Sequence, residues 1–205
     1  AASDVYKRQM HHGRGVMTNP DGYRYEGDWV DGLKEGTAVI TYPDGAIYKG
    51  GIVRGAREGR GVLEMSEGLI FDGIWKDGEI TGLGKLIQPN GDIYEGMLVA
   101  GRRHGPGRVT YANGDIYDGN FDADQRQGLG QFIGTDGYEY NSNWENGQIK
   151  GEGKVIYPDG SVYVGAFEAG LANGVGKIDY PDGSSYQGEW SQGVIEGEGV
   201  ATYAN

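Results

Sequence analysis

The fold is decided by the stretch Tyr25–Gly45, YEGDWVDGLKEGTAVITYPDG, and by its near copies along the chain. In these copies a tyrosine or phenylalanine returns every 23 residues without insertion or deletion. A short fixed period is typical of a solenoid, in which each repeat packs on its neighbours, so binding residues are expected along its faces. The recurring aromatic residues are Tyr25, Tyr48, Phe71, Tyr94, Tyr117, Tyr140, Tyr163 and Tyr186.

Each copy reads as two strands joined by glycine-rich turns. Asp-Gly and Asn-Gly pairs, such as Asp44-Gly45, predict tight hairpin turns because glycine accepts a positive φ. No stretch has the apolar period of a helix. The sequence therefore predicts an all-β, elongated, single-domain solenoid of β-hairpin repeats. A partial repeat is expected over residues 10–24, followed by eight repeats that begin at residues 25, 48, 71, 94, 117, 140, 163 and 186, while residues 1–9 do not match and are interpreted as an assembly scar.

The aromatic positions predict the core. Residues one, three and five of a strand share a face, which places Tyr25 and Trp29 together across Gly27. The missing side chain of the glycine leaves room for the rings. Ile40 and Tyr42 of the second strand are expected to join the same core.

The units Tyr25–Gly45 and Tyr94–Gly114 resemble the membrane occupation and recognition nexus (MORN) repeat, and the resemblance extends over about residues 13–205. It implies a twisted strip of β-hairpins that acts as a scaffold for partner proteins or membranes and that in some proteins dimerises. Such repeats occur in junctophilins, in plant phosphatidylinositol phosphate kinases and in cytoskeleton-associated proteins. This chain departs from the pattern at Asp124, Gly134 and Ser142, where we expect a local change of twist.

The composition argues against several classes of function. A net charge of −12 opposes binding to nucleic acid, and the chain has no cysteine and only three histidines. The G-x-G-K stretch Gly82–Lys85 is not followed by the serine or threonine of a phosphate loop. Turn aspartates of adjacent repeats would lie about 10 Å apart, too far to share a calcium ion. We therefore expect no cofactor, metal or enzymatic activity, although a catalytic domain elsewhere in a longer protein remains open.

Apolar residues also recur on the strand face opposite the aromatic one. Either the rolled sheet buries them against itself, or they form a groove for a protein partner. The groove could receive an amphipathic helix or a second copy of the chain. The candidate partner-binding residues are Ile47, Ile70, Ile74, Ile87, Ile93, Met97, Ile116 and Ile133.

A second candidate surface is basic and would bind an anion, an acidic partner or a lipid, unless its charges are simply solvated turn residues. Its residues are Arg54, Arg57, Arg60, Arg102, Arg103 and Arg126. We expect a non-enzymatic protein-binding scaffold in the cytoplasm, peripheral at a membrane or at the cytoskeleton. The first alternative is a peripheral tether that binds anionic phospholipid. The second, ranked lower, is a carbohydrate-binding surface solenoid, which would carry more closely spaced Trp-Tyr pairs than this chain does.

Overall fold

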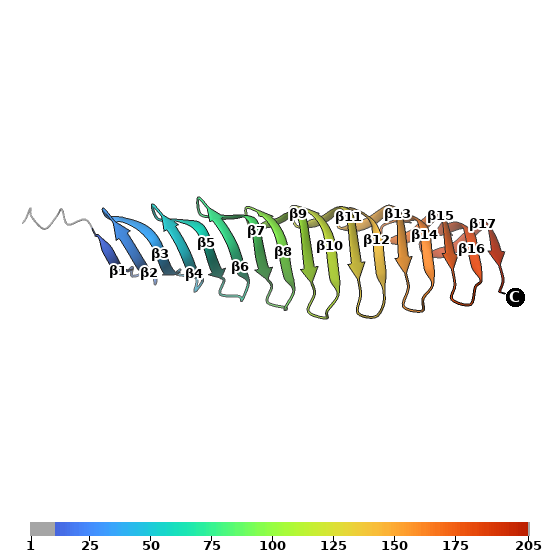
Figure 1. Cartoon of the computed structure of the whole chain (residues 1–205), viewed down its shortest axis with the longest axis horizontal. Helices are drawn as coiled ribbons and strands as arrows, with labels where there is room; N and C mark the ends of the chain where they lie inside the picture. Colours follow the sequence, from blue (N-terminus) through green and yellow to red (C-terminus); the bar gives the residue numbers. More distant parts are fainter. Residues whose placement is uncertain (1–10, 205) are drawn as a thin grey trace, which may run out of the picture. The chain divides into compact units, whose positions relative to one another are not determined.

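The computed structural model describes residues 11–204, so the segment 1–9 lies outside the described part. Within residues 11–204 the chain forms 17 strands and no helix (Figure 1). The predicted all-β solenoid of hairpin repeats is confirmed. The strands are β1 (Gly13–Thr18), β2 (Arg24–Val30), β3 (Leu33–Thr41), β4 (Ile47–Val53), β5 (Ala56–Glu64), β6 (Ile70–Lys76), β7 (Glu79–Ile87), β8 (Ile93–Val99), β9 (Arg102–Thr110), β10 (Ile116–Asp122), β11 (Gln125–Ile133), β12 (Glu139–Glu145), β13 (Gln148–Ile156), β14 (Val162–Glu168), β15 (Leu171–Asp179), β16 (Ser185–Ser191) and β17 (Val194–Thr202).

The chain divides into two units. The first contains residues 11–91 and Met97–Gly101, and the second contains Asp92–Gly96 and residues 102–204, so that β8 is divided between them. In the first unit, β1 to β7 pair antiparallel in chain order. In the second unit, β9 to β17 do the same.

The core of a repeat is a tyrosine ring folded over two glycines. Gly50 of β4 lies opposite Gly61 of β5, and the ring of Tyr48 covers both. The Tyr48 hydroxyl donates a hydrogen bond of 3.0 Å to the carbonyl of Gly51. This bond holds the ring in the space that two absent side chains leave free. The same bond recurs from Tyr25 to Asp28, Tyr117 to Asn120, Tyr163 to Ala166 and Tyr186 to Glu189.

Edge-to-face ring contacts join several repeats to the next. The ring centroids of Tyr48 and Trp75 lie 5.4 Å apart, and those of Tyr163 and Trp190 lie 5.1 Å apart. Trp75 also donates from Nε1 to the carbonyl of Gly61 at 2.9 Å. Such contacts stabilise beyond the area that they bury, so the aromatic columns hold neighbouring repeats together.

The two turns of each repeat differ in kind. Arg54 and Gly55, with φ of 48° and 84°, form a two-residue turn between β4 and β5. The Asp44-Gly45 turn is longer, because Tyr42 N–H bonds to the carbonyl of Ala46 at 2.8 Å. Asp44 Oδ1 accepts the Ala46 N–H at 3.0 Å. The sequence thus predicted the place of this turn correctly, but not its three-residue form, which recurs without a proline between Tyr111 and Asp115 and between Gly134 and Tyr138.

Substitutions at two glycines of one repeat test the effects of packing and of backbone strain separately. A Cβ on Gly50 would lie 2.5 Å from the Gly61 Cα, so Gly50→Val should destabilise the protein by about 1–3 kcal/mol through overpacking. A Cβ on Gly55 would meet nothing within 4 Å, but its φ is +84°. Gly55→Ala should therefore cost about 1 kcal/mol through strain alone. Urea denaturation of both variants measures the difference, and a Gly50→Val midpoint equal to that of the parent would contradict the packing described here.

Candidate functional site

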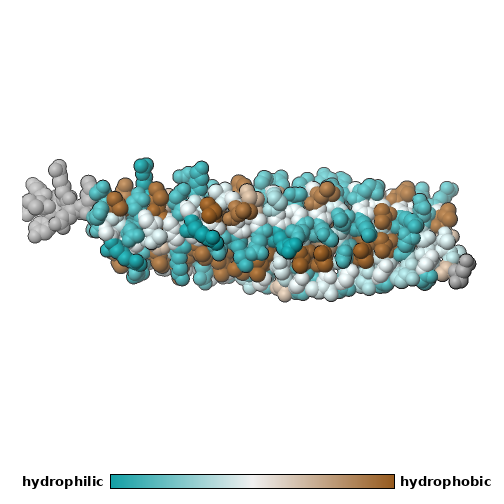
Figure 2. Space-filling view, in the orientation of Figure 1, coloured by the Kyte–Doolittle hydropathy of each residue, from teal (hydrophilic) through white to brown (hydrophobic). Residues whose placement is uncertain are grey.

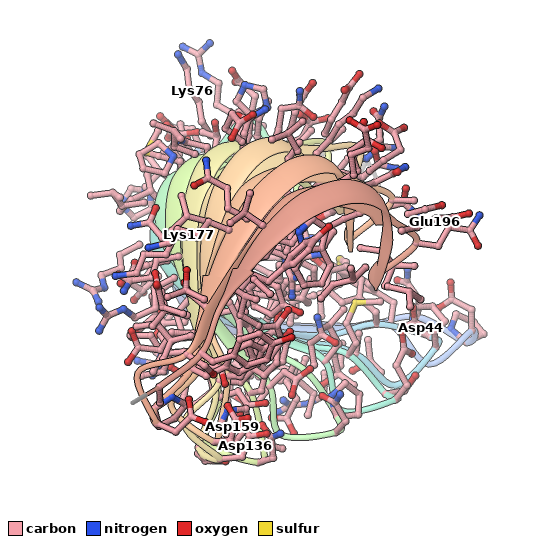
Figure 3. All side chains as sticks on the ribbon, turned by 90° about the vertical axis from the view of Figure 1, so that its right-hand side faces the viewer. Asp44, Lys76, Asp136, Asp159, Lys177 and Glu196 are labelled. Atoms are coloured by element: carbon pink, nitrogen blue, oxygen red, sulfur yellow. The ribbon has the colours of Figure 1, made fainter. Side chains whose placement is uncertain are left out.

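The strands present two chemically different faces. In the second unit, Figure 3 shows Lys177 on the outer side of the curved ribbon, and Asp136 and Asp159 in the turns. Because side chains alternate along a strand, Gly176 and Ile178 face the inside of the curve. The inner face carries the aromatic columns, and the outer face carries charged and aliphatic residues.

The outer face holds the candidate partner-binding residues. Ile70 lies directly opposite Ile87, and Ile116 lies opposite Ile133. The rows also contain acidic residues, since Ile133 lies opposite Glu139 on its other side. Figure 2 shows apolar groups interspersed with polar ones. All of the predicted residues are half-buried or exposed, so the sheet does not bury them in a second core.

Three of the predicted arginines instead lie on the inner face, over aromatic rings. The guanidinium carbon of Arg57 lies 4.3 Å from the ring centroid of Trp75, and that of Arg103 lies 5.0 Å from Phe121. Arg126 lies 4.6 Å from both Tyr117 and Trp144. Cations over rings are stabilised by the ring quadrupole, so these arginines contribute to the fold.

The other predicted arginines lie elsewhere. Arg54 is in a turn, Arg60 lies opposite Ile74 on the outer face, and Arg102 is an exposed residue at the start of β9. The arginines therefore do not form a single basic patch in either unit. Sequence adjacency suggested a cluster, but alternation along a strand sends neighbouring side chains to opposite faces.

Burial changes the acidity of the core tyrosines. Desolvation raises the pKa of Tyr48 to about 12, although the positive charge of Arg57 acts in the opposite direction. The pKa values of Tyr25, Tyr94, Tyr117 and Tyr163 are raised to about 12 by the same desolvation. Neutral hydroxyls are therefore part of the folded structure at physiological pH.

The repeat that begins at Tyr140 breaks the pattern. Ser142 replaces the glycine opposite Gly153, and its Oγ fills the space beside Gly153. The Tyr140 hydroxyl bonds instead to the hydroxyl of Tyr138 at 2.6 Å, and the two ring centroids lie 4.5 Å apart. The structure shows a displaced ring in this repeat, and the change of twist expected at Ser142 stays a prediction.

A cavity of about 310 Å³ lies beside this displaced ring. A second cavity of about 400 Å³ lies next to it, and Arg126 and Phe132 line both. The sequence analysis missed this site, although the Gly134 and Ser142 departures were its signal. Among residues 11–204 no group of acidic or histidine side chains could hold a metal ion. The described chain also contains no helix that could cross a membrane.

The sequence model of the MORN repeat matches residues 7–22, 25–47, 48–69, 71–93, 94–116, 117–137, 140–162, 163–185 and 186–205. The chain belongs to the MORN repeat family. A tyrosine over a glycine pair is the structural core of most of these MORN repeats. No curated protein sequence matches the chain.

The MORN repeats are similar in fold to solved domains of low sequence identity. The TCP10 domain of Danio rerio CPAP, solved in complex with a peptide of Danio rerio STIL, is 16% identical with a TM-score of 0.52, over 88% of this chain and 82% of that one. The same CPAP domain solved alone is 15% identical with a TM-score of 0.50, over 85% of this chain and 83% of that one. At this identity the likeness concerns the fold.

The raised tyrosine pKa values predict how stability depends on pH. An exposed tyrosine ionises near pH 10, so between pH 10 and 12 the unfolded chain loses protons that the folded chain keeps. The contribution of these groups should be complete below pH 10 and should fall as the pH rises towards 12. Urea midpoints from pH 8 to 11.5 test this, and a midpoint that stays constant over that range would contradict it.

Proposed function

We propose that this MORN repeat chain is a non-enzymatic scaffold that binds a protein partner through the aliphatic rows of its outer face. The partner segment is an amphipathic helix. Equivalent positions of consecutive repeats are about 10 Å apart, and seven residues of a helix span about 10.5 Å. A helix with apolar residues at heptad spacing therefore matches the rows.

The exposure of these rows is the observation that carries the proposal. Ile74 and Ile133 are 44% and 39% exposed, and Ile133 lies directly opposite the half-buried Ile116. A sheet face turned to water normally carries polar residues at these positions, so uncovered aliphatic rows favour a binding surface.

Two further observations support a scaffold. The similar CPAP domain has been solved with a peptide of another protein, which gives an example of this fold in a peptide complex. The described residues also include no group suited to a metal ion, and the polar side chains of the inner face hold turns and rings rather than an open reaction site.

Changes to the second unit's outer row test the proposal. Ile116→Ser with Ile133→Ser should weaken binding of selected amphipathic helices at least about tenfold, because two paired apolar side chains are lost. The helices are selected on the parent protein from a displayed library of 21-residue sequences with apolar heptad positions. The β circular-dichroism signal should persist, with a stability loss of roughly 1 kcal/mol per substitution.

The matched control is Lys154→Ser with Lys177→Ser, which changes charged positions of the same face and should leave helix binding within about twofold. If the isoleucine variant binds the selected helices as tightly as the parent does, the rows are not the binding surface. If it unfolds, the rows belong to the core.

A membrane tether is the competing function, and the positions of the arginines give it less support. Arg57 and Arg103 already bond to turn groups of their own unit, which leaves fewer cations for lipid headgroups. The parent protein should therefore stay in the supernatant when vesicles with phosphatidylserine are sedimented at physiological salt. Sedimentation of most of the protein with these vesicles would favour the tether instead.

A further inference from the structure

Arg126 differs from the arginines at equivalent positions of other repeats. Arg57 donates from Nε and Nη2 to the carbonyl of Gly78, at 3.1 Å and 2.6 Å. Arg103 likewise donates to the carbonyl and the carboxylate of Asp124. In residues 11–204, the Arg126 side chain donates only to the Tyr111 hydroxyl and has no carboxylate within ion-pair distance.

Aromatic rings hold the Arg126 guanidinium in place, although most of its N–H donors are free. A guanidinium carries five N–H donors in a rigid fork, and most of those of Arg126 have no protein acceptor. The group is held over Tyr117 and Trp144, 4.6 Å from each ring centroid. Its position is therefore fixed by the rings, as a preorganised anion-binding group requires.

The cavity beside Arg126 is lined by the displaced ring of Tyr140. In a regular repeat the tyrosine packs on the aromatic residue four places later, as Tyr163 does on Phe167 at 5.2 Å. Tyr140 packs on Tyr138 and on Phe132, at 4.5 Å and 6.2 Å. The cavity left beside Trp144 has a mainly apolar lining that includes Phe132, Tyr140, Trp144 and Ile149.

We propose that this cavity and the guanidinium form an Arg126 pocket that binds the carboxyl-terminal residue of a partner polypeptide. The apolar side chain of that residue enters the cavity, and its terminal carboxylate pairs with the free N–H groups of Arg126. About 310 Å³ is at the lower limit for ligand pockets, which suits one amino-acid residue. The pocket is independent of the outer-face rows.

Negative charge on the other side of Arg126 further restricts the class of ligand that the pocket can bind. Asp92 and Asp115 line the adjoining cavity of about 400 Å³. Hydrogen bonds from the Thr135 N–H, the Asn113 side chain and the Thr135 hydroxyl keep the pKa of the Asp115 carboxyl below its usual range, so this group is ionised. A run of acidic residues would meet these charges, whereas a single carboxylate joined to an apolar side chain needs only Arg126 and the cavity.

Hexapeptides Gly-Ser-Gly-Ser-Gly-Leu with a free or an amidated carboxyl terminus test the proposal. Titration followed by the indole N–H signal of Trp144 should show saturable binding of the free acid and at least tenfold weaker binding of the amide. Absence of a saturable shift with the free acid overturns the proposal. An amidated peptide ending in Leu-Glu that binds as tightly as the free acid overturns the choice of a chain terminus.

Variants separate binding from folding. Arg126→Gln should abolish binding of the free-acid peptide. Ser142→Gly should also abolish it, because Tyr140 can then return over the glycine pair and fill the cavity, while the melting temperature is kept or raised. Arg57→Gln is the matched control, since it removes an equally stacked guanidinium in the first unit and should leave binding unchanged. Undiminished binding by a folded Ser142→Gly protein contradicts the proposed pocket.

Discussion

The structure depends on a tyrosine that lies over the glycine two residues ahead and over a small residue of the adjacent strand, and that is anchored there by its hydroxyl. The ring needs a glycine two residues ahead and only a small residue opposite that glycine, as in Tyr48 over Gly50 and Gly61 and in Tyr25 over Gly27 and Ala38. The hydroxyl needs the carbonyl three residues ahead. Together these conditions fix the ring against the sheet. In repeats such as that of Tyr48, the aromatic residue of the following repeat packs edge-to-face against this ring. The contact fixes the position of one repeat on the next.

Two repeats show what happens when one condition fails. Phe71 has no hydroxyl, and the space beside Gly73 and Gly84 is instead approached by Ile80 and Leu98. Tyr140 keeps its hydroxyl but meets Ser142, and the ring moves to Tyr138. In the first case aliphatic side chains take the space of the ring. In the second, a cavity remains beside Trp144, and the arginine next to it keeps free donors.

The fold could be predicted from the sequence because its signals are local and periodic. The aromatic period gave the repeat, and alternation along the strand correctly placed Tyr25 and Trp29 on one face. The form of the Asp44-Gly45 turn was harder to predict from the sequence, since it depends on which backbone groups close the loop. The sequence also could not tell whether the sheet buries the isoleucine rows, because that depends on how strongly it curves.

The sites were predicted less completely than the fold. Arg57 and Arg126 occupy the same place in their repeats, yet only Arg57 bonds to the next turn, and no local pattern distinguishes them. The cavity lies beside Tyr140, whose ring is displaced in the repeat where Ser142 stands opposite Gly153. The departure from the repeat at Ser142 identified the correct region of the chain. The displacement of the Tyr140 ring and the cavity beside it could be seen only in the structure.

A crystal structure of the Ser142→Gly protein tests the central claim most directly. If the glycine two residues ahead and a hydroxyl decide where the ring lies, Tyr140 should fold over the substituted position and Gly153, and its hydroxyl should donate to the carbonyl of Asn143. The Tyr140–Tyr138 hydroxyl bond should be lost, and the cavity beside Trp144 should close. A Tyr140 ring that stays against Tyr138 in that structure would contradict the account.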